Sequence, residues 1–153
     1  DAVRVKQKYP GKKYYRGSKK GQYSCNPLGK NPGDLWTIPN VKANHVEKTI
    51  HPCQFPIGLA QRIIRALSPE GGVVFDPFMG AGSTGAAAIL EQRRFTGIEL
   101  DEKYYNIAKE RLTLAQNGLL KYRDIETPVF DPSKAGAVAR DPIIVKPTQE
   151  LAL

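Results

Sequence analysis

The pattern of apolar and polar positions is clearest between residues 56 and 117, where it predicts three helices and two strands. The run Val73–Phe75 follows a Gly-Gly turn and contains no polar residue, as is typical of a parallel strand covered on both faces. A second strand is predicted over residues 94–99, and the small residues of 84–92 favour a helix between the two strands. This order of elements predicts a parallel β-α-β unit and an α/β fold.

Two amphipathic helices are predicted, one before and one after this unit. Pro56 begins the first, which runs through Leu67. Its expected apolar face consists of Ile57, Ala60, Ile63, Ile64 and Leu67. Asp101 is expected to cap the second, which ends near Asn117, and Arg111 is placed on its solvated charged face. The apolar stripe of this second helix consists of Tyr104, Ile107, Ala108, Leu112 and Ala115.

The turn between the first strand and its helix carries the pattern G-x-G-x-x-G, at Gly80, Gly82 and Gly85. Such glycines let the backbone turn sharply and approach a ligand closely, and Ser83 is expected to cap the helix that follows. Dinucleotide sites share this pattern, with a carboxylate such as Glu99 on a ribose. The alternative is that the glycines only permit close packing of strand and helix.

The carboxylate of Asp76, at the end of the first strand, changes this interpretation. A negative charge directly before the loop repels a pyrophosphate but attracts a ligand that carries an ammonium and a sulfonium group. S-adenosylmethionine is such a ligand. Glu99 fits either cofactor, because two carboxylate oxygens can accept from two neighbouring ribose hydroxyls.

Three stretches resemble motifs of the amino-directed (N6-adenine/N4-cytosine) DNA methyltransferases. Residues 75–84, F-D-P-F-M-G-A-G-S-T, look like the cofactor-binding motif of that family, and residues 96–112 are similar to its next segment. His51–Pro56 resembles the motif that precedes them in the permuted, or beta-type, group. The resemblance covers about residues 33–113. It implies part of a Rossmann-like methyltransferase sheet, with the cofactor motifs in the C-terminal portion of the enzyme.

The resemblance also implies a reaction, in which a methyl group passes from S-adenosylmethionine to an exocyclic amino group of a flipped DNA base. Adenine is the expected target and amino-cytosine the alternative. Asp76 would hold the methionyl ammonium, Phe78 would pack on the cofactor and Glu99 would bind the ribose. The full set of expected cofactor contacts is His51, Phe55, Asp76, Phe78, Gly80, Gly82, Ser83, Thr84 and Glu99.

A second family signature, Asp, Asn or Ser followed by Pro-Pro and an aromatic residue, is absent from the sequence. In the family it holds the target amino group and stacks on the flipped base. We therefore expect no catalytic residue within this chain, which alone is expected to be inactive. The resemblance implies that an N-terminal portion of the same enzyme supplies this signature, and that a restriction endonuclease can be its counterpart.

The net charge of +8 is concentrated at the N-terminus, where residues 1–48 hold eleven Lys and Arg against three acids. These basic residues alternate with tyrosines without a lasting helical or strand period. This composition suits contact with DNA phosphates and bases, and a solvated tail is the alternative. The residues expected to contact double-stranded DNA are Lys12, Lys13, Arg16, Lys19 and Lys20. The expected parts are a basic arm (1–48), a cofactor-binding α/β segment (49–122) and a proline-punctuated tail (123–153) with one or two short strands.

Composition narrows the remaining choices. A chain of 153 residues with 41% hydrophobic residues can bury one core, and it contains no apolar run of membrane-spanning length. Its polar, basic start does not have the pattern expected of a signal peptide. Two cysteines form no disulfide framework, so a cytoplasmic location is expected, and no zinc-like spacing predicts a metal site. Two other classes remain as alternatives: a nicotinamide-dependent oxidoreductase and a non-catalytic nucleic-acid-binding domain.

Overall fold

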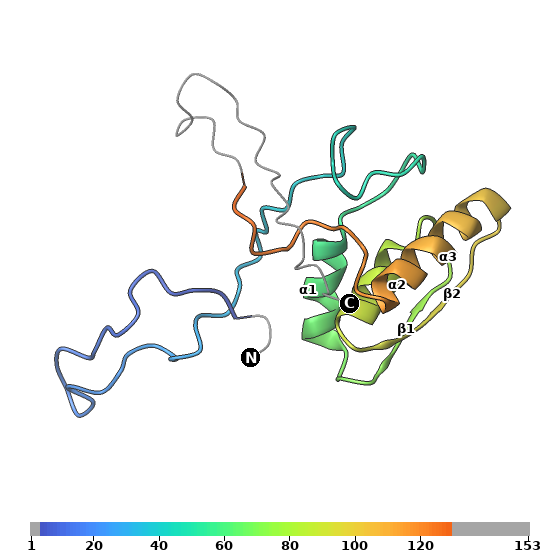
Figure 1. Ribbon diagram of the computed structural model, residues 1–153. Coiled ribbons are helices and arrows are strands. Elements are labelled where there is room, and N and C mark those ends of the chain that lie inside the picture. Colours follow the sequence, from blue (N-terminus) through green and yellow to red (C-terminus); the bar gives the residue numbers. More distant parts are fainter. Residues whose placement is uncertain (1–3, 130–153) are drawn as a thin grey trace, which may run out of the picture.

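The computed structural model describes residues 4–129. Its regular elements are, in order, α1 (Ile57–Leu67), β1 (Val73–Asp76), α2 (Ser83–Leu90), β2 (Arg94–Gly97) and α3 (Glu102–Gln116). The two strands pair in parallel, with Val73 opposite Arg94 and Asp76 opposite Gly97. The predicted β-α-β unit and the α/β class are therefore confirmed (Figure 1).

Helix α2 is the centre of the core. It contacts both strands, and α1 and α3 each pack against it. The side chains of Ala86, Ala87 and Ala88 are fully buried, and their small size lets the neighbouring elements approach closely. From α1, Ile57 is also fully buried, a burial that contributes about 2–3 kcal/mol.

The opposite face of the sheet is open in the described part of the chain. Val73 and Phe75 are 56% and 58% exposed, whereas Val74 and Phe95 pack against the core. The prediction that Val73–Phe75 is covered on both faces is therefore wrong for residues 4–129. The reason is that α2 covers only one face of this two-stranded sheet, so alternate side chains of β1 point away from the helices.

The apolar face predicted for α1 is only partly correct. Ile57, Ala60 and Ile64 are buried, but Ile63 is 42% and Leu67 82% exposed. The packing of α1 on α2 covers a stripe narrower than the full set of apolar positions, so the side chains at its margin stay in solvent.

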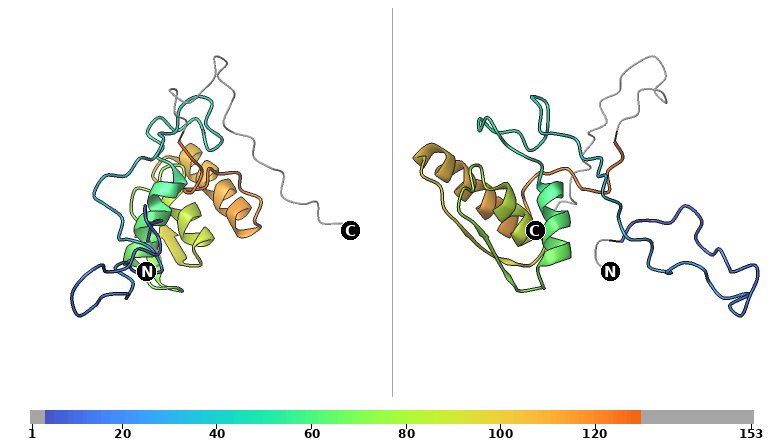
Figure 2. Two further views of the ribbon diagram at one scale, coloured as in Figure 1. Left: turned by 90° about the vertical axis from the view of Figure 1, so that its left-hand side faces the viewer. Right: turned by 180° about the vertical axis from the view of Figure 1, so that it is seen from behind.

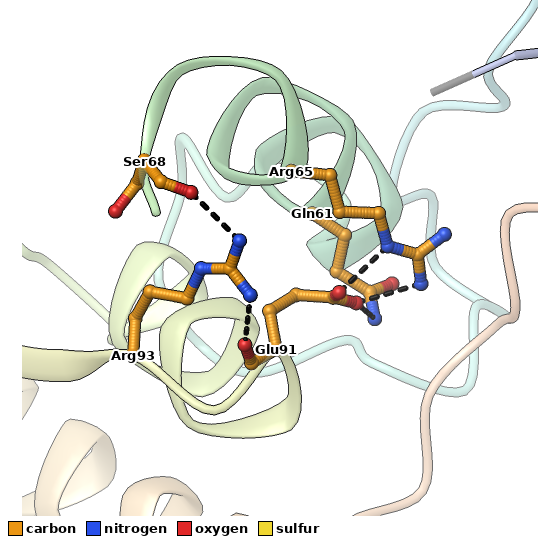
Figure 3. Close-up of polar contacts among 5 residues, drawn as sticks. All are labelled: Gln61, Arg65, Ser68, Glu91 and Arg93. Atoms are coloured by element: carbon orange, nitrogen blue, oxygen red, sulfur yellow. Dashed lines mark hydrogen bonds and ion pairs between the residues drawn. The ribbon is translucent and has the colours of Figure 1, made fainter. Parts of the chain in front are cut away.

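A polar cluster ties the C-terminal half of α1 to the end of α2 (Figure 3). Arg65 donates to the Glu91 carboxylate through Nε at 2.6 Å and through a terminal nitrogen at 2.7 Å, and Gln61 donates to it at 2.7 Å. The hydrogen bond that Arg65 donates to Glu91 raises the pKa of Arg65. Arg93 donates to the backbone oxygen of Ser68 at 2.7 Å, which links the turns that follow the two helices.

The helix caps confirm one prediction and overturn another. The carboxylate of Asp101 accepts from the backbone nitrogens of Lys103 (2.9 Å) and Tyr104 (3.2 Å), so it caps α3 as predicted. The predicted cap of α2 by Ser83 is wrong. Gly82 occupies the cap position with a left-handed φ of 73°, and Ser83 is the first helical residue with its side chain buried.

Outside these elements the chain is irregular. Residues 4–30 form a long excursion away from the helices, visible in blue in Figures 1 and 2. Residues 119–129 contain neither helix nor strand, and the strands predicted for the tail could fall only in 130–153, outside the described residues. No helix within residues 4–129 has the length and apolar character needed to cross a membrane.

Candidate functional site

Two acidic residues lie at the same edge of the sheet. The parallel ladder continues beyond β2, since the Ile98 nitrogen donates to the Asp76 oxygen at 3.0 Å and the Met79 nitrogen donates to the Ile98 oxygen at 2.9 Å. Asp76 at the end of β1 and Glu99 shortly after β2 therefore lie beside the loop of residues 77–82. The Asp76 carboxylate also accepts from the Phe78 nitrogen at 3.1 Å, which orients it at the start of this loop.

The carboxylate of Glu99 is held by the backbone on both oxygens. One oxygen accepts from the Gly80 nitrogen at 2.8 Å and the other from the Asp101 nitrogen at 2.9 Å. A carboxylate oxygen can accept more than one hydrogen bond, so each retains capacity for a ligand hydroxyl. Glu99 therefore links the glycine loop to the start of α3, and its carboxylate is held in one orientation.

The loop glycines are required by left-handed backbone and by close contacts. Gly80 has φ 50°, and a Cβ there would lie 2.9 Å from Nε2 of His51. Gly82 has φ 73°, and a Cβ there would lie 3.0 Å from the Cβ of Ala108 in α3. A side chain at either position would meet a neighbour and strain the backbone. The prediction that these glycines serve a sharp turn is confirmed.

His51 reaches Gly80 from a loop that is itself fixed by hydrogen bonds. Its ring packs edge-on against Tyr104 of α3, with centroids 4.5 Å apart, and its Nδ1 accepts from the Cys53 nitrogen at 3.2 Å. The backbone nitrogen of His51 donates to the hydroxyl of Thr49 at 3.2 Å. His51, Gly80 and Glu99 thus form one contiguous group, joined by the backbone of the loop.

Buried polar residues support the His51 loop, and sequence reasoning missed them. Gln54 donates to the backbone oxygen of Glu47 at 2.5 Å and accepts from the Thr49 nitrogen at 3.0 Å. The Glu47 carboxylate accepts from the nitrogens of Ile57 (2.8 Å) and Arg123 (3.1 Å), joining the start of α1 to the chain beyond α3. The position of Gln54 inside the H-P-C-Q-F-P stretch was the available signal for its importance.

The remaining predicted cofactor residues differ in their surroundings. Phe78 is 87% exposed, so its ring lies in solvent, whereas Phe55 is 39% exposed and most of its surface is covered by the protein. Thr84 is half-buried in the first turn of α2, next to the buried Ser83. The structure therefore brings together His51, the two glycines and the two carboxylates, and leaves the ring of Phe78 in solvent.

Arg111 does not lie on a solvated face of α3, and that prediction is wrong. The residue is only 6% exposed, and its guanidinium donates to the backbone oxygen of Ala81 and, at 3.4 Å, to the hydroxyl of Ser83. Burial lowers the pKa of Arg111, and the negative charge of Glu47 opposes that shift. Helical period alone placed it among charged residues, whereas α3 packs so that this position faces the loop.

Residues 4–30 of the basic arm form a hairpin-like loop. Isolated antiparallel bridges join Val5 to Lys30 and Lys13 to Tyr23, and the backbone of Tyr14 exchanges hydrogen bonds with Gln22 and Gly21 at 3.0 Å. The Lys13 ammonium lies 5.3 Å from the ring centre of Tyr23. The five predicted DNA contacts, Lys12, Lys13, Arg16, Lys19 and Lys20, are all exposed. In Figures 1 and 2 this hairpin-like loop, drawn in blue, projects away from the helices and from the glycine loop.

Within residues 4–129, no group of three or more His, Cys, Asp or Glu side chains is arranged to hold a metal ion. The candidate site is instead a glycine turn between parallel strand ends that carry carboxylates. This places the chain in the class of α/β proteins that bind ligands at the carboxyl ends of parallel strands.

The chain belongs to a particular family within this class, the N6/N4 DNA methylases, whose sequence profile matches residues 1–110. It is 46% identical over 113 residues to the type II methyltransferase M.BglII of Bacillus subtilis, covering 74% of this chain and 31% of that protein. It is 42% identical over 86 residues to the DNA adenine methyltransferase YhdJ of Escherichia coli K12, covering 56% and 29%. The resemblance seen in the motifs is confirmed at the level of the family.

The chain spans about a third of the length of these curated relatives, 31% of M.BglII and 35% of M.ScaI of Streptomyces caespitosus. Among solved structures, it is similar to the M1.HpyAVI complex with SAM (43% identity, TM-score 0.40), over 43% of this chain and 33% of that one. It is also similar to the cytosine-N4-specific PvuII DNA methyltransferase (25% identity, TM-score 0.46), over 61% and 39%.

Proposed function

We propose that this chain forms the S-adenosylmethionine-binding part of a DNA methyltransferase that modifies an exocyclic amino group. The observation that carries the proposal is the pair of carboxylates, Asp76 and Glu99, on either side of a loop that turns at Gly80 and Gly82. Membership of the N6/N4 methylase family supports it.

The charged and accepting groups at the site match the chemistry of this cofactor. Asp76 offers a negative charge to an ammonium or sulfonium group, and the same charge disfavours a pyrophosphate. Glu99 offers one accepting site on each oxygen, and its two backbone hydrogen bonds keep the carboxylate from rotating away. The open face of Phe78 is available to pack on an adenine or on the methionyl chain.

In the proposed reaction, S-adenosylmethionine supplies a methyl group, whose bond to sulfur breaks as a bond to the amino nitrogen of the base forms. The amino nitrogen then loses a proton, and S-adenosylhomocysteine is left. The residues of this chain contribute position and charge: Asp76 and Glu99 hold the two ends of the cofactor, and the glycine loop sets its depth. The group that holds the target base must come from a segment that carries the Pro-Pro-aromatic signature.

We propose adenine as the target base. One support is the similarity to YhdJ, named as a DNA adenine methyltransferase. The other is the resemblance of the His51–Pro56 stretch to adenine-directed members of the family. Methylation of cytosine at its amino group is the alternative outcome of the same assay.

The basic arm is proposed to bind double-stranded DNA. Its five exposed cationic residues lie on a hairpin-like loop, a shape that can follow a groove and contact phosphates on both sides. Neighbouring tyrosines such as Tyr15 and Tyr23 are exposed and add stacking surface.

The proposal is tested by calorimetry on the full enzyme, in which this chain is joined to the segment that carries the Pro-Pro-aromatic signature. We expect S-adenosylmethionine and S-adenosylhomocysteine to bind at one shared site, and NAD neither to bind nor to compete. Transfer of labelled methyl groups to DNA, followed by nucleoside analysis, then identifies the modified base. Binding of NAD in competition with S-adenosylmethionine would contradict the assignment, and cofactor binding without any methyl transfer would favour a non-catalytic DNA-binding protein.

A further inference from the structure

Helix α3 contacts the glycine loop but supplies none of the residues proposed to hold the cofactor. Arg111 and Ala108 lie three residues apart on α3, so they lie on the same face of that helix. The Cα of Ala108 would lie 3.2 Å from a Cβ at Gly82, and Arg111 donates to the backbone oxygen of Ala81. Helix α3 therefore touches the loop on both sides of a single peptide bond, the one between Ala81 and Gly82.

Both ends of this peptide group are held. Its oxygen accepts from Arg111, and its nitrogen, on Gly82, donates to the Met79 oxygen at 2.8 Å. The first hydrogen bond of α2 runs from Ala86 to the oxygen of Gly82, one residue later. The Ala81 oxygen thus lies before the first hydrogen bond of the helix, and the Arg111 guanidinium holds it in place.

Arg111 is also unusual in its burial. A guanidinium is costly to remove from water unless its donors find partners, yet one terminal nitrogen of Arg111 is buried without a hydrogen-bond partner in the structure. An apolar side chain of similar size could fill the same volume without that cost. Retaining a cation here therefore serves the orientation of the loop rather than the packing of α3 on α2.

We propose that Arg111 is a positioning residue that fixes the Ala81–Gly82 peptide in the conformation that receives S-adenosylmethionine. This inference rests on the proposed function. Because Arg111 acts only through the loop, its loss should change the affinity for the cofactor without a matching change in the affinity for DNA. A residue that only packs α3 against α2 would instead change thermal stability and leave both affinities per folded molecule unaltered.

The test compares Arg111→Met with wild type in the full enzyme, in which this chain is joined to the segment that carries the Pro-Pro-aromatic signature. Methionine keeps an unbranched side chain of similar reach but donates no hydrogen bond. We expect the dissociation constant and the KM for S-adenosylmethionine to rise about tenfold or more, as for loss of a charged hydrogen bond, while the KM for DNA stays within about twofold. Arg111→Lys, which keeps one charged donor, should show an intermediate rise.

Arg65→Met is the matched control, because it removes an arginine whose carboxylate partner, Glu91, is largely buried (11% exposed) at the other end of α2. It should lower the melting temperature without raising the dissociation constant for the cofactor. Folded Arg111→Met that binds S-adenosylmethionine within about twofold of wild type would overturn the inference. Where that variant does not fold, wild-type affinity in Arg111→Lys would overturn it. Wild-type protein that fails to bind the cofactor would overturn the proposed function itself.

Discussion

At the scale of single residues, the two carboxylates differ in what holds them. Asp76 accepts one backbone hydrogen bond, from Phe78, whereas Glu99 accepts two, from Gly80 and Asp101. Asparagine at position 76 can keep the hydrogen bond to Phe78 and lose only the charge. Glutamine at position 99 must turn its amide nitrogen toward one of two backbone donors, which also disturbs the loop.

We therefore expect Asp76→Asn to weaken binding of S-adenosylmethionine about tenfold to a hundredfold, equivalent to about 1.5–3 kcal/mol, with the melting temperature unchanged. Glu99→Gln should lose at least as much affinity and also some stability. Titration calorimetry and thermal unfolding measure both quantities. Glu110→Gln, on the exposed face of α3, is the control for charge. Affinity retained in both site variants would show that these carboxylates do not bind the cofactor.

At the scale of elements, the basic arm and the β-α-β core are built by different forces. The core is held by burial of small and branched apolar side chains around α2. The arm has exposed side chains over residues 9–23, and backbone hydrogen bonds with cation–π pairs such as Arg16 on Tyr15 (5.6 Å) hold its shape. Changes in the arm should therefore alter binding to DNA without altering the stability of the core.

A quadruple variant tests the arm, with Lys12, Lys13, Lys19 and Lys20 all changed to Gln. We expect binding to fall alike for all DNA sequences, and the slope of log K against log salt to flatten by about 0.9 for each DNA phosphate that the variant no longer neutralises. Fluorescence anisotropy at several salt concentrations measures this slope. The control makes the same change in charge outside the arm, at the exposed Lys103, Lys109, Lys121 and Arg94, each changed to Gln. An unchanged slope in the arm variant would identify the arm as a solvated loop.

At the scale of the whole molecule, the described part of the chain leaves one sheet face and apolar side chains such as Phe75 and Leu100 in solvent. Two paired strands also leave backbone donors and acceptors open at the outer edges of the sheet. We propose that a segment carrying the Pro-Pro-aromatic signature supplies the missing cover and the base-holding group together. The open face of the sheet is then the surface on which the base-holding segment packs, and that packing is needed both for folding and for catalysis.

This proposal predicts that residues 1–153 by themselves transfer no methyl group to DNA and give little soluble protein. Joining the segment that bears the signature should restore both properties, because it covers the apolar face and adds the base-binding group. Soluble yield and incorporation of labelled methyl groups are measured side by side. Robust methylation by residues 1–153 alone would contradict it.

Several features were predictable from the sequence because short-range rules govern them. The β-α-β unit follows from two apolar runs around a helix of small residues, and Asp101 caps α3 because a cap depends only on the next three residues. The glycine loop was predictable for the same reason, since a left-handed turn needs residues without a Cβ. The family motifs rest on this same local stretch.

Tertiary structure alone decided which of these side chains are buried and which meet. Val73 and Phe75 have the sequence pattern of core residues, but they are exposed because only one face of the sheet is covered by a helix. Arg111 has the pattern of a surface residue, but the packing of α3 buries it against Ala81 of the glycine loop. His51 meets Gly80 for a similar reason, through hydrogen bonds that fold its loop back. Local pattern sets the elements of this protein, whereas burial and contact depend on how the elements pack against one another.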